Sequence, residues 1–161
     1  MQSGNLKKIV VSTTVGRLRQ RPGFADKILP AISNDLAVIT GQKPAPRQAR
    51  KSIAGFKIRE GDIVGLKVTL RGKRMKDFLK RFVEVVLPRV RDFRGIDPKA
   101  IDAQGNLTIG IKEHIVFPEV APDEVKIDFG LEITLVSDTK SKEESYKLFK
   151  SLGVPLMKES K

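Results

Sequence analysis

The sequence predicts an α+β fold in which helices cover one face of a β-sheet and leave its other face exposed. Residues 64–71 alternate between apolar and polar side chains, as in a strand with one buried face. Residues 73–87 instead carry apolar side chains at helical spacing. Predicted strands and helices follow one another in mixed order along the chain, which is typical of this fold class.

The first expected elements are a strand and a helix joined by a loop. Ile9–Val15 is β-branched almost throughout and predicts a strand, and Gly16–Gly23, which contains Gly, Pro and Arg, predicts a loop. A helix ending at Gly41 follows, in which Pro30 must either open the helix or kink it. The apolar residues at helical spacing that predict it are Phe24, Ile28, Ile32, Leu36 and Ile39.

The segment Gln42–Gly61 follows neither the strand period nor the helix period. Pro44 and Pro46 exclude a central strand, so we expect a long basic loop or an irregular hairpin that projects from the domain. Long loops in compact domains are usually functional or disordered. Three apolar residues that could anchor the loop favour function: Ile53, Phe56 and Ile58. Phe56 is expected to anchor the loop rather than to stack on a base.

The strand after this loop is the clearest in the sequence. Its expected core side chains are Val64, Leu66, Val68 and Leu70, and its expected exposed side chains are Gly65, Lys67, Thr69 and Arg71. The exposed set forms a polar, cationic ladder. The helix that follows is expected over Lys73–Leu87 and should end at Pro88, because a residue before proline avoids the helical conformation.

The last third of the chain predicts further strands and a capped helix. Strands are expected at Leu107–Ile111 and Leu131–Val136, with weaker candidates at Ile115–Phe117 and Val125–Phe129, and these should be antiparallel neighbours. The final helix has Ser141 and Glu144 in capping-box spacing and ends at Gly153 and Pro155. We find no repeat and expect one domain over residues 1–161.

Charge is distributed unevenly between the two halves of the chain. The whole sequence has 31 Lys and Arg against 19 Asp and Glu, a net charge of +12. Residues 1–80 hold 18 basic and 5 acidic side chains, whereas residues 81–161 hold 13 and 14. A solubility surface would intersperse the two signs, so this asymmetry indicates a polyanionic partner. Nucleic acid is favoured over an anionic membrane, because membrane binding usually uses a basic amphipathic helix with Trp or Phe on its other face and the chain has no Trp.

Composition excludes several kinds of site. The chain has no Cys, which removes disulfides, thiolate zinc sites and thiol nucleophiles and suits a reducing cytoplasm. The single His114 leaves no His pair for a metal, so we expect a structural role for it. The nearby carboxylates are expected at a solvated surface rather than in a catalytic pair: Glu119, Asp123, Glu124 and Asp128. We expect no cofactor, no signal peptide and no membrane span.

With these sites excluded, the chain still offers many hydrogen-bond donors that suit RNA phosphates and sugars. Between Gly41 and Lys76 there are 11 basic residues against only 2 acidic ones, and they occupy the long loop and the exposed face of the clearest strand. On that strand Lys67 and Arg71 can contact phosphates, and the Thr69 hydroxyl can bond a ribose 2′-OH. RNA binding is therefore the expected function, against the alternative that these side chains only decorate a solvated strand.

Five segments resemble one protein family, in the family's order. They are GQKP (41–44), ARKSIAGFKIREG (49–61), KVTLRGKRM (67–75), LPRVRDFRGI (87–96) and GNLTIGIKEHIVFPEV (105–120). Together with the capped last helix they span roughly residues 6–157 and resemble the L-five family of bacterial-type large-subunit ribosomal proteins. The family carries a further helical segment before the first strand, and this sequence begins almost at that strand.

The resemblance implies a curved antiparallel sheet with helices on one face and 5S rRNA bound to the other, concave face. The family's polar trio on that sheet corresponds to Gln42, Thr69 and Ser12, where Ser12 replaces the usual Asn. Expected rRNA-binding residues are Lys7, Ser12, Gln42, Lys43, Lys67, Thr69, Arg71, Arg91 and Arg94. The resemblance also implies that the basic loop contacts P-site tRNA, through Arg50, Lys51, Ser52, Gly55, Phe56, Lys57 and Arg59.

The expected partners are 5S rRNA, large-subunit rRNA, P-site tRNA and neighbouring ribosomal proteins, including one of the small-subunit head. The expected location is the cytoplasmic ribosome. The loop Gly16–Gly23, with three arginines, is expected to add rRNA contact. Two other classes of function stay open, namely an RNA-processing or RNA-modifying enzyme and an RNA chaperone acting off the ribosome. No catalytic constellation in the sequence supports the enzyme.

Overall fold

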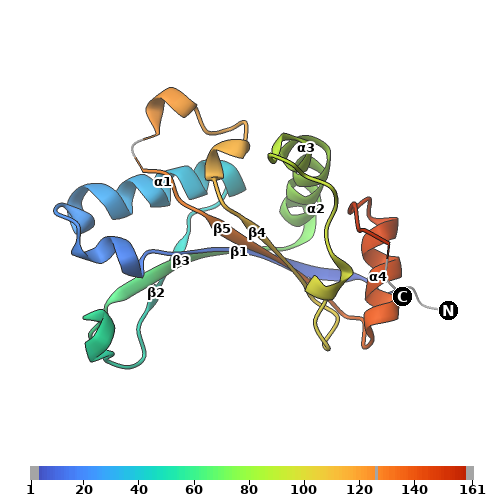
Figure 1. Cartoon of the computed structure of the whole chain (residues 1–161), viewed down its shortest axis with the longest axis horizontal. Coiled ribbons are helices and arrows are strands. Elements are labelled where there is room, and N and C mark those ends of the chain that lie inside the picture. Colours follow the sequence, from blue (N-terminus) through green and yellow to red (C-terminus); the bar gives the residue numbers. More distant parts are fainter. Residues whose placement is uncertain (1–3, 126, 159–161) are drawn as a thin grey trace.

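One five-stranded antiparallel sheet forms the centre of the molecule (Figure 1). The computed structural model describes residues 4–125 and 127–158, and of Phe56 the backbone but not the side chain. The strands are β1 (Leu6–Thr14), β2 (Ala45–Gln48), β3 (Ile63–Leu70), β4 (Leu107–Ile111) and β5 (Leu131–Ser137). Their order is β2-β3-β1-β5-β4, so the first strand of the chain is the central one. Every neighbouring pair is antiparallel, as predicted.

The helices leave one face of the sheet uncovered. They are α1 (Leu29–Thr40), α2 (Gly72–Arg81), α3 (Leu87–Arg89) and α4 (Lys142–Ser151). In Figure 1, α1, α2 and α3 lie on one side of the sheet, and α4 stands at its end near the start of the chain. The predicted α+β class and the predicted open face are confirmed. Within the described part of the chain, no helix combines the length and apolar character needed to cross a bilayer.

Burial alternates along β3 because successive side chains of a strand point to opposite faces. Leu66, Val68 and Leu70 are at most 4% exposed, whereas Lys67 and Thr69 between them are half-buried. The predicted division of β3 into an apolar and a polar face is therefore confirmed. The central strand β1 repeats the pattern, with its own apolar side chains in the core.

Two expected members of the exposed ladder differ from the prediction. Gly65 is buried, because the backbone of Thr13 on the neighbouring strand lies so close that a Cβ on Gly65 would be 2.9 Å from its carbonyl oxygen. Arg71 is exposed as predicted, but it is the residue before α2 rather than part of the strand. The cationic ladder of β3 itself is therefore shorter than expected.

Both long helical runs contain a wide π-helical turn directly ahead of a proline. The turn Phe24–Ile28 precedes Pro30, and the turn Phe82–Val86 precedes Pro88. In each, the N–H of the residue before the proline donates to the carbonyl five residues back. Proline lacks an N–H and its ring crowds the carbonyl four residues back, so a wider turn lets the helix continue past it. The predicted end at Pro88 was therefore wrong, because the helix runs on to Arg89.

Three other expectations meet different outcomes. The irregular hairpin is confirmed, because β2 pairs with β3 at the sheet edge, where Pro46 is tolerated. The prediction of a loop at Gly16–Gly23 is wrong over Gly16–Gln20, because these residues form a 3-10 helix. The capped helix is confirmed, since the Ser141 side chain accepts the Glu144 N–H at 3.2 Å.

The two weak strand candidates are wrong. Residues 114–116 form a 3-10 turn, and residues 125 and 127–129 of the second candidate carry no strand. Their apolar character comes from packing: Phe117 and Phe129 are at most 7% exposed and belong to the core. Short apolar runs without alternation cannot distinguish a strand from a buried irregular segment.

Candidate nucleic-acid interface

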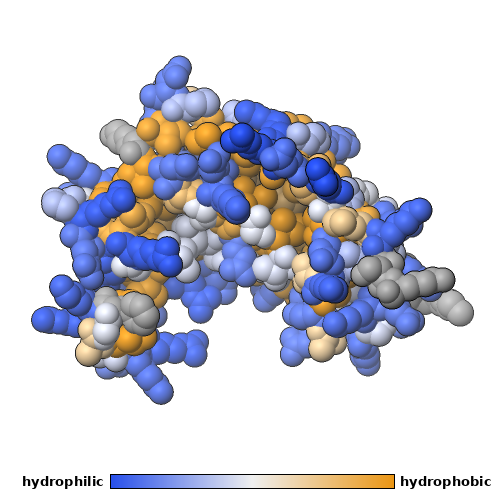
Figure 2. Space-filling model, viewed as in Figure 1, coloured by the Kyte–Doolittle hydropathy of each residue, from blue (hydrophilic) through white to orange (hydrophobic). Residues whose placement is uncertain are grey.

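The open face of the sheet is mainly polar. Strand pairing aligns its side chains in rows across the sheet, one made of Thr69, Val10, Thr134 and Thr108 and the next of Lys67, Ser12, Glu132 and Gly110. Figure 2 shows mostly hydrophilic colours along this lower side of the molecule, between two projecting lobes. Such a surface of hydroxyls and cations suits ribose and phosphate better than an apolar partner.

The structure brings the predicted polar trio close together, with Ser12 and Thr69 on this face and Gln42 bonded to the backbone of β3. The Gln42 side-chain amide donates to the backbone carbonyl of Thr69 at 3.0 Å, and Arg74 donates to the Gln42 side-chain oxygen at 3.2 Å. Ser12 pairs with Lys67, two residues before Thr69, and so lies diagonal to Thr69 on the same face. All three members of the trio are half-buried. The Gln42 amide is therefore held in place by these two hydrogen bonds before any RNA arrives.

Several cations lie near the trio. The register of strand pairing determines which of them share the open face. Lys67 lies on the open face, and Lys43 is exposed just before β2. Lys7, expected among the RNA contacts, is exposed at an irregularity in the β1–β5 pairing. Lys8 instead occupies the paired row on the same face as Ser12. Arg47 on β2 pairs with Gly65 and shares this face too. Lys8 and Arg47 were missed because sequence alone does not give strand register.

The other two predicted arginines lie in the segment between α3 and β4. Arg91 and Arg94 are both exposed in the segment after α3. Arg91 lines a small hollow together with Gly110 of β4 and with Lys112. Arg91 is therefore close to the margin of the open face, whereas Arg94 is exposed farther along the same segment.

The basic loop between β2 and β3 supports its own shape. At its base the Ala49 N–H donates to the Asp62 carbonyl at 2.7 Å, and near its tip Ile53 and Ile58 exchange two backbone hydrogen bonds. The loop projects away from the helices in Figure 1. All its predicted contact residues with described side chains are exposed: Arg50, Lys51, Ser52, Gly55, Lys57 and Arg59. The predicted contact of the Phe56 side chain lies outside the described part of the chain.

An ion pair joins the base of this loop to the 3-10 helix Gly16–Gln20. Asp62 accepts the Arg59 N–H at 2.8 Å and pairs with the Arg19 guanidinium at 2.8 Å. These contacts, the Arg59 hydrogen bond first, lower the pKa of Asp62 below its ordinary value of 3.8. Arg19 also lies 5.9 Å from the centre of the Phe24 ring. The Arg19 side chain thus holds the base of the loop in place. The Arg17 side chain, in contrast, is exposed.

Replacing Arg19 with Ala should loosen the loop without unfolding the protein. We expect faster amide hydrogen exchange at Ile53 and Ile58 and little change in global stability, as is usual when a surface ion pair is removed. Because the pKa of Asp62 is lowered, its stabilising contribution is complete above pH 3.8 and is lost as pH falls through the lower folded value. Arg17→Ala is the control and should leave exchange unchanged. Equal exchange in both variants would contradict this anchoring role.

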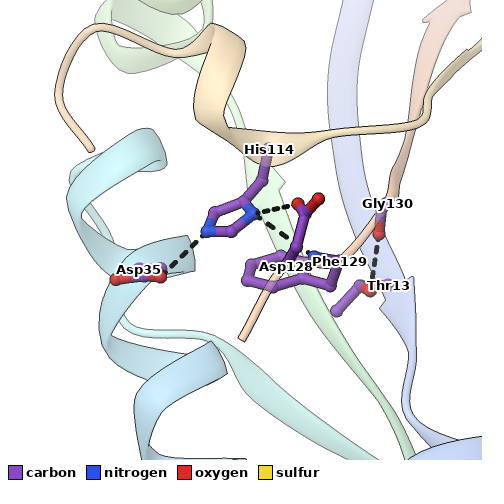
Figure 3. A network of polar contacts seen from close by, with 6 residues as sticks. All are labelled: Thr13, Asp35, His114, Asp128, Phe129 and Gly130. Atoms are coloured by element: carbon purple, nitrogen blue, oxygen red, sulfur yellow. Dashed lines mark hydrogen bonds and ion pairs between the residues drawn. The ribbon is translucent and has the colours of Figure 1, made fainter. Parts of the chain in front are cut away.

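The single histidine joins the helical layer to the segment before β5. His114 is fully buried, with Nε2 2.9 Å from Asp35 on α1 and Nδ1 3.2 Å from Asp128, and its ring stacks on Phe129 (Figure 3). These contacts give it the structural role that was predicted. Asp128 is therefore a partner of His114 rather than a purely solvated group, and Glu119 pairs with Arg81 at 2.7 Å. Among the described residues, no three acidic or histidine side chains form a metal-binding group.

Comparison with known proteins places the chain in a family. A family model described as "Ribosomal protein L5" matches residues 1–59, and a second model, described as the C-terminus of the same ribosomal family, matches residues 63–156. The chain is 51% identical over 150 residues to large ribosomal subunit protein uL5 of Halothermothrix orenii, covering 93% of this chain and 82% of that protein. It is 50% identical to the Syntrophomonas wolfei protein of the same name (96% and 85% covered) and 48% identical to that of Fusobacterium nucleatum (98% and 84%). With both halves matched in order and about half of all positions identical, the chain belongs to the ribosomal protein L5 family.

Proposed function

We propose that this chain is a structural, non-enzymatic protein of the large ribosomal subunit, in the cytoplasm, and that its open sheet face binds 5S rRNA. The relatives named above are large-subunit proteins, which supports the ribosomal role. The observation that carries the RNA proposal is the group of Gln42, Thr69 and Ser12, in which the Gln42 amide is already bonded to the Thr69 carbonyl beside a face flanked by cations. Ordered donors and acceptors lose little freedom on binding, so they favour a defined RNA contact.

The open face would make two kinds of contact with RNA, one to phosphates and one to ribose hydroxyls. Lys8, Lys67 and Arg47, together with Arg71 just after β3, would neutralise phosphates, which gives affinity without reading sequence. The threonine and serine hydroxyls of the rows would bond ribose 2′-OH groups, which separates RNA from DNA. Arg91 and Arg94 would extend the contact beyond β4 to other large-subunit rRNA. The apolar core beneath contributes rigidity rather than contacts.

The basic loop would serve a second RNA. Its exposed cations Arg50, Lys51, Lys57 and Arg59 stand on a self-supporting hairpin, so they can meet the backbone of P-site tRNA without distinguishing one tRNA from another. We propose that residues 1–161 act as one domain from which the loop at 42–61 projects. Exposed surface beyond these RNA contacts remains for neighbouring ribosomal proteins, including one of the small-subunit head.

Salt dependence tests the sheet footprint. If about 5 phosphates are neutralised, the logarithm of the 5S rRNA binding constant should fall with log[salt] at a slope of about −3.5 to −4.5. Lys67→Ala and Arg71→Ala should each reduce that slope by nearly one unit, whereas Thr69→Val should weaken binding at constant slope. Filter binding at four salt concentrations measures all three. Unchanged slopes in both charge variants would move the footprint away from the sheet, and absence of stoichiometric 5S rRNA in purified large subunits with this protein would reject the proposal.

A further inference from the structure

One acidic side chain stands on the face that is proposed to bind RNA. Glu132 on β5 is the only acidic residue in any of the five strands of the described structure. Its pairing with Ser12 places its side chain on the open face, and it is exposed. A carboxylate there repels phosphate, so it opposes the phosphate contacts around it. An acidic group at this place needs a different kind of RNA contact.

The nearest cation of the same row does not reach this carboxylate. Lys67 also pairs with Ser12, but from the opposite side, so Lys67 and Glu132 are two strand spacings apart, about 10 Å between Cα atoms. Within the described part of the chain, Glu132 makes neither an ion pair nor a side-chain hydrogen bond. Both of its oxygens can therefore accept hydrogen bonds from a ligand.

The space beside Glu132 is open, and its lining includes small residues and the cation Lys112 as well as the carboxylate. A hollow of about 410 Å³ is bounded there by Ser12, Thr14, Gly110, Lys112, Gly130 and Glu132. Gly110 faces Glu132 across the β4–β5 pair, and a Cβ placed on Gly110 would meet no atom within 4 Å. A flat group can therefore approach the sheet at this point, with hydroxyls on one side and the carboxylate on another.

The chemistry of a carboxylate selects the ligand. An ionised carboxylate only accepts hydrogen bonds, so among RNA groups it bonds hydroxyls and the N–H donors of bases. The Watson–Crick edge of guanine presents two adjacent donors, N1–H and N2–H, which match the two carboxylate oxygens, and such edges are accessible in single-stranded RNA. We propose that Glu132 is a base-reading residue that accepts hydrogen bonds from the Watson–Crick edge of an unpaired guanine seated in this hollow. The inference rests on the proposed binding of 5S rRNA to the open face.

The variant Glu132→Gln tests the inference by the sign of its effect. Glutamine keeps the shape, removes the repulsive charge and turns one acceptor into a donor. If Glu132 reads a base, 5S rRNA binding should weaken by roughly 5- to 150-fold, the range for a good bidentate contact, although the protein has become more positive. If Glu132 only lies near phosphates, the same variant should bind more tightly, which would overturn the inference.

Glu84→Gln is the matched control. Glu84 is exposed in the π-helical turn that follows α2, on the helix-covered side, and its replacement changes net charge by the same amount. It should alter affinity little or raise it slightly. Both variants should melt like the wild type because both side chains are exposed. Equal behaviour of the two variants would also overturn the base-reading role.

Inosine, which lacks the guanine N2 amino group, identifies the nucleotide. In 5S rRNA with inosine placed at single guanine positions, one position should weaken binding to the wild type and have no further effect on Glu132→Gln. If every inosine position affects both proteins alike, Glu132 reads no guanine. Failure of the wild type to bind unmodified 5S rRNA would instead reject the proposed function itself, so the two failures are distinguishable.

Discussion

Replacing Phe82 with Ala should lower the free energy of unfolding by about 3–5 kcal/mol, the range for removing a large aromatic side chain from a core. Phe82 is 1% exposed and lies in a cluster with two other phenylalanines. Its ring centre is 6.0 Å from that of Phe78 and 6.3 Å from that of Phe117. The cluster joins the helical run to the segment after β4, so the cavity would loosen both. Urea unfolding followed by circular dichroism measures the change.

Val85→Ala is the control for this substitution. Val85 lies in the same π-helical turn as Phe82 but is 40% exposed, so its truncation should change stability by about 0.5 kcal/mol or less. RNA affinity of both folded variants should match that of the wild type, since neither side chain is on the open face. An unchanged unfolding midpoint in Phe82→Ala would show that the apolar stripe of the helix is not core.

Replacing Ser52–Arg59 with a short Gly/Ser linker should separate two RNA activities. The segment contributes exposed cations and a hairpin tip whose hydrogen bonds are mainly internal, so its removal should leave the sheet intact. We expect unchanged 5S rRNA affinity and unchanged assembly into large subunits, together with faster loss of tRNA from the P site. The factor should be similar for different tRNAs, because backbone contacts do not read sequence.

The test compares the 5S rRNA affinity of the free protein with the retention of P-site tRNA by ribosomes that carry the same protein. Dissociation of several labelled tRNAs from ribosomes carrying either loop gives the retention, and filter binding of the free protein gives the 5S rRNA affinity. A second variant that keeps the loop but replaces Lys57 and Arg59 with Gln would separate charge from shape. If the linker variant stays folded yet fails to bind 5S rRNA, the loop belongs to the 5S footprint and the proposed division of labour is wrong.

Alternation and capping could be predicted from the sequence because they are local. Lys67 and Thr69 alternate with apolar neighbours, and that pattern was enough to place them on the exposed face of β3. The Ser141 cap likewise depends only on residues within one turn. The trio came from a resemblance to the family, and the structure adds the hydrogen bond from Gln42 to the Thr69 carbonyl.

The features that could not be predicted depend on pairing between distant segments. Lys8 rather than Lys7 enters the paired row because the β1–β5 pairing is irregular between Leu6 and Lys8. Arg19, suspected of RNA contact, is held by Asp62, which lies more than forty residues away. Glu132 gains its place beside Ser12 on the open face only when β5 pairs with β1. The helix beyond Pro88 was missed because a π-helical turn has no signature in the apolar period.

The central position of β1 also has a consequence for synthesis. β1 is made first, yet one of its two neighbours is β5, and residues 15–130 must be made between them. One edge of β1 therefore stays without its partner until nearly the whole chain has left the exit tunnel. Pairings this distant in sequence form slowly, and unpaired edges invite association with other chains. We expect ribosome-bound nascent chains that end before Leu131 to lack the complete RNA face, so that RNA capture follows translation of this protein rather than accompanying it.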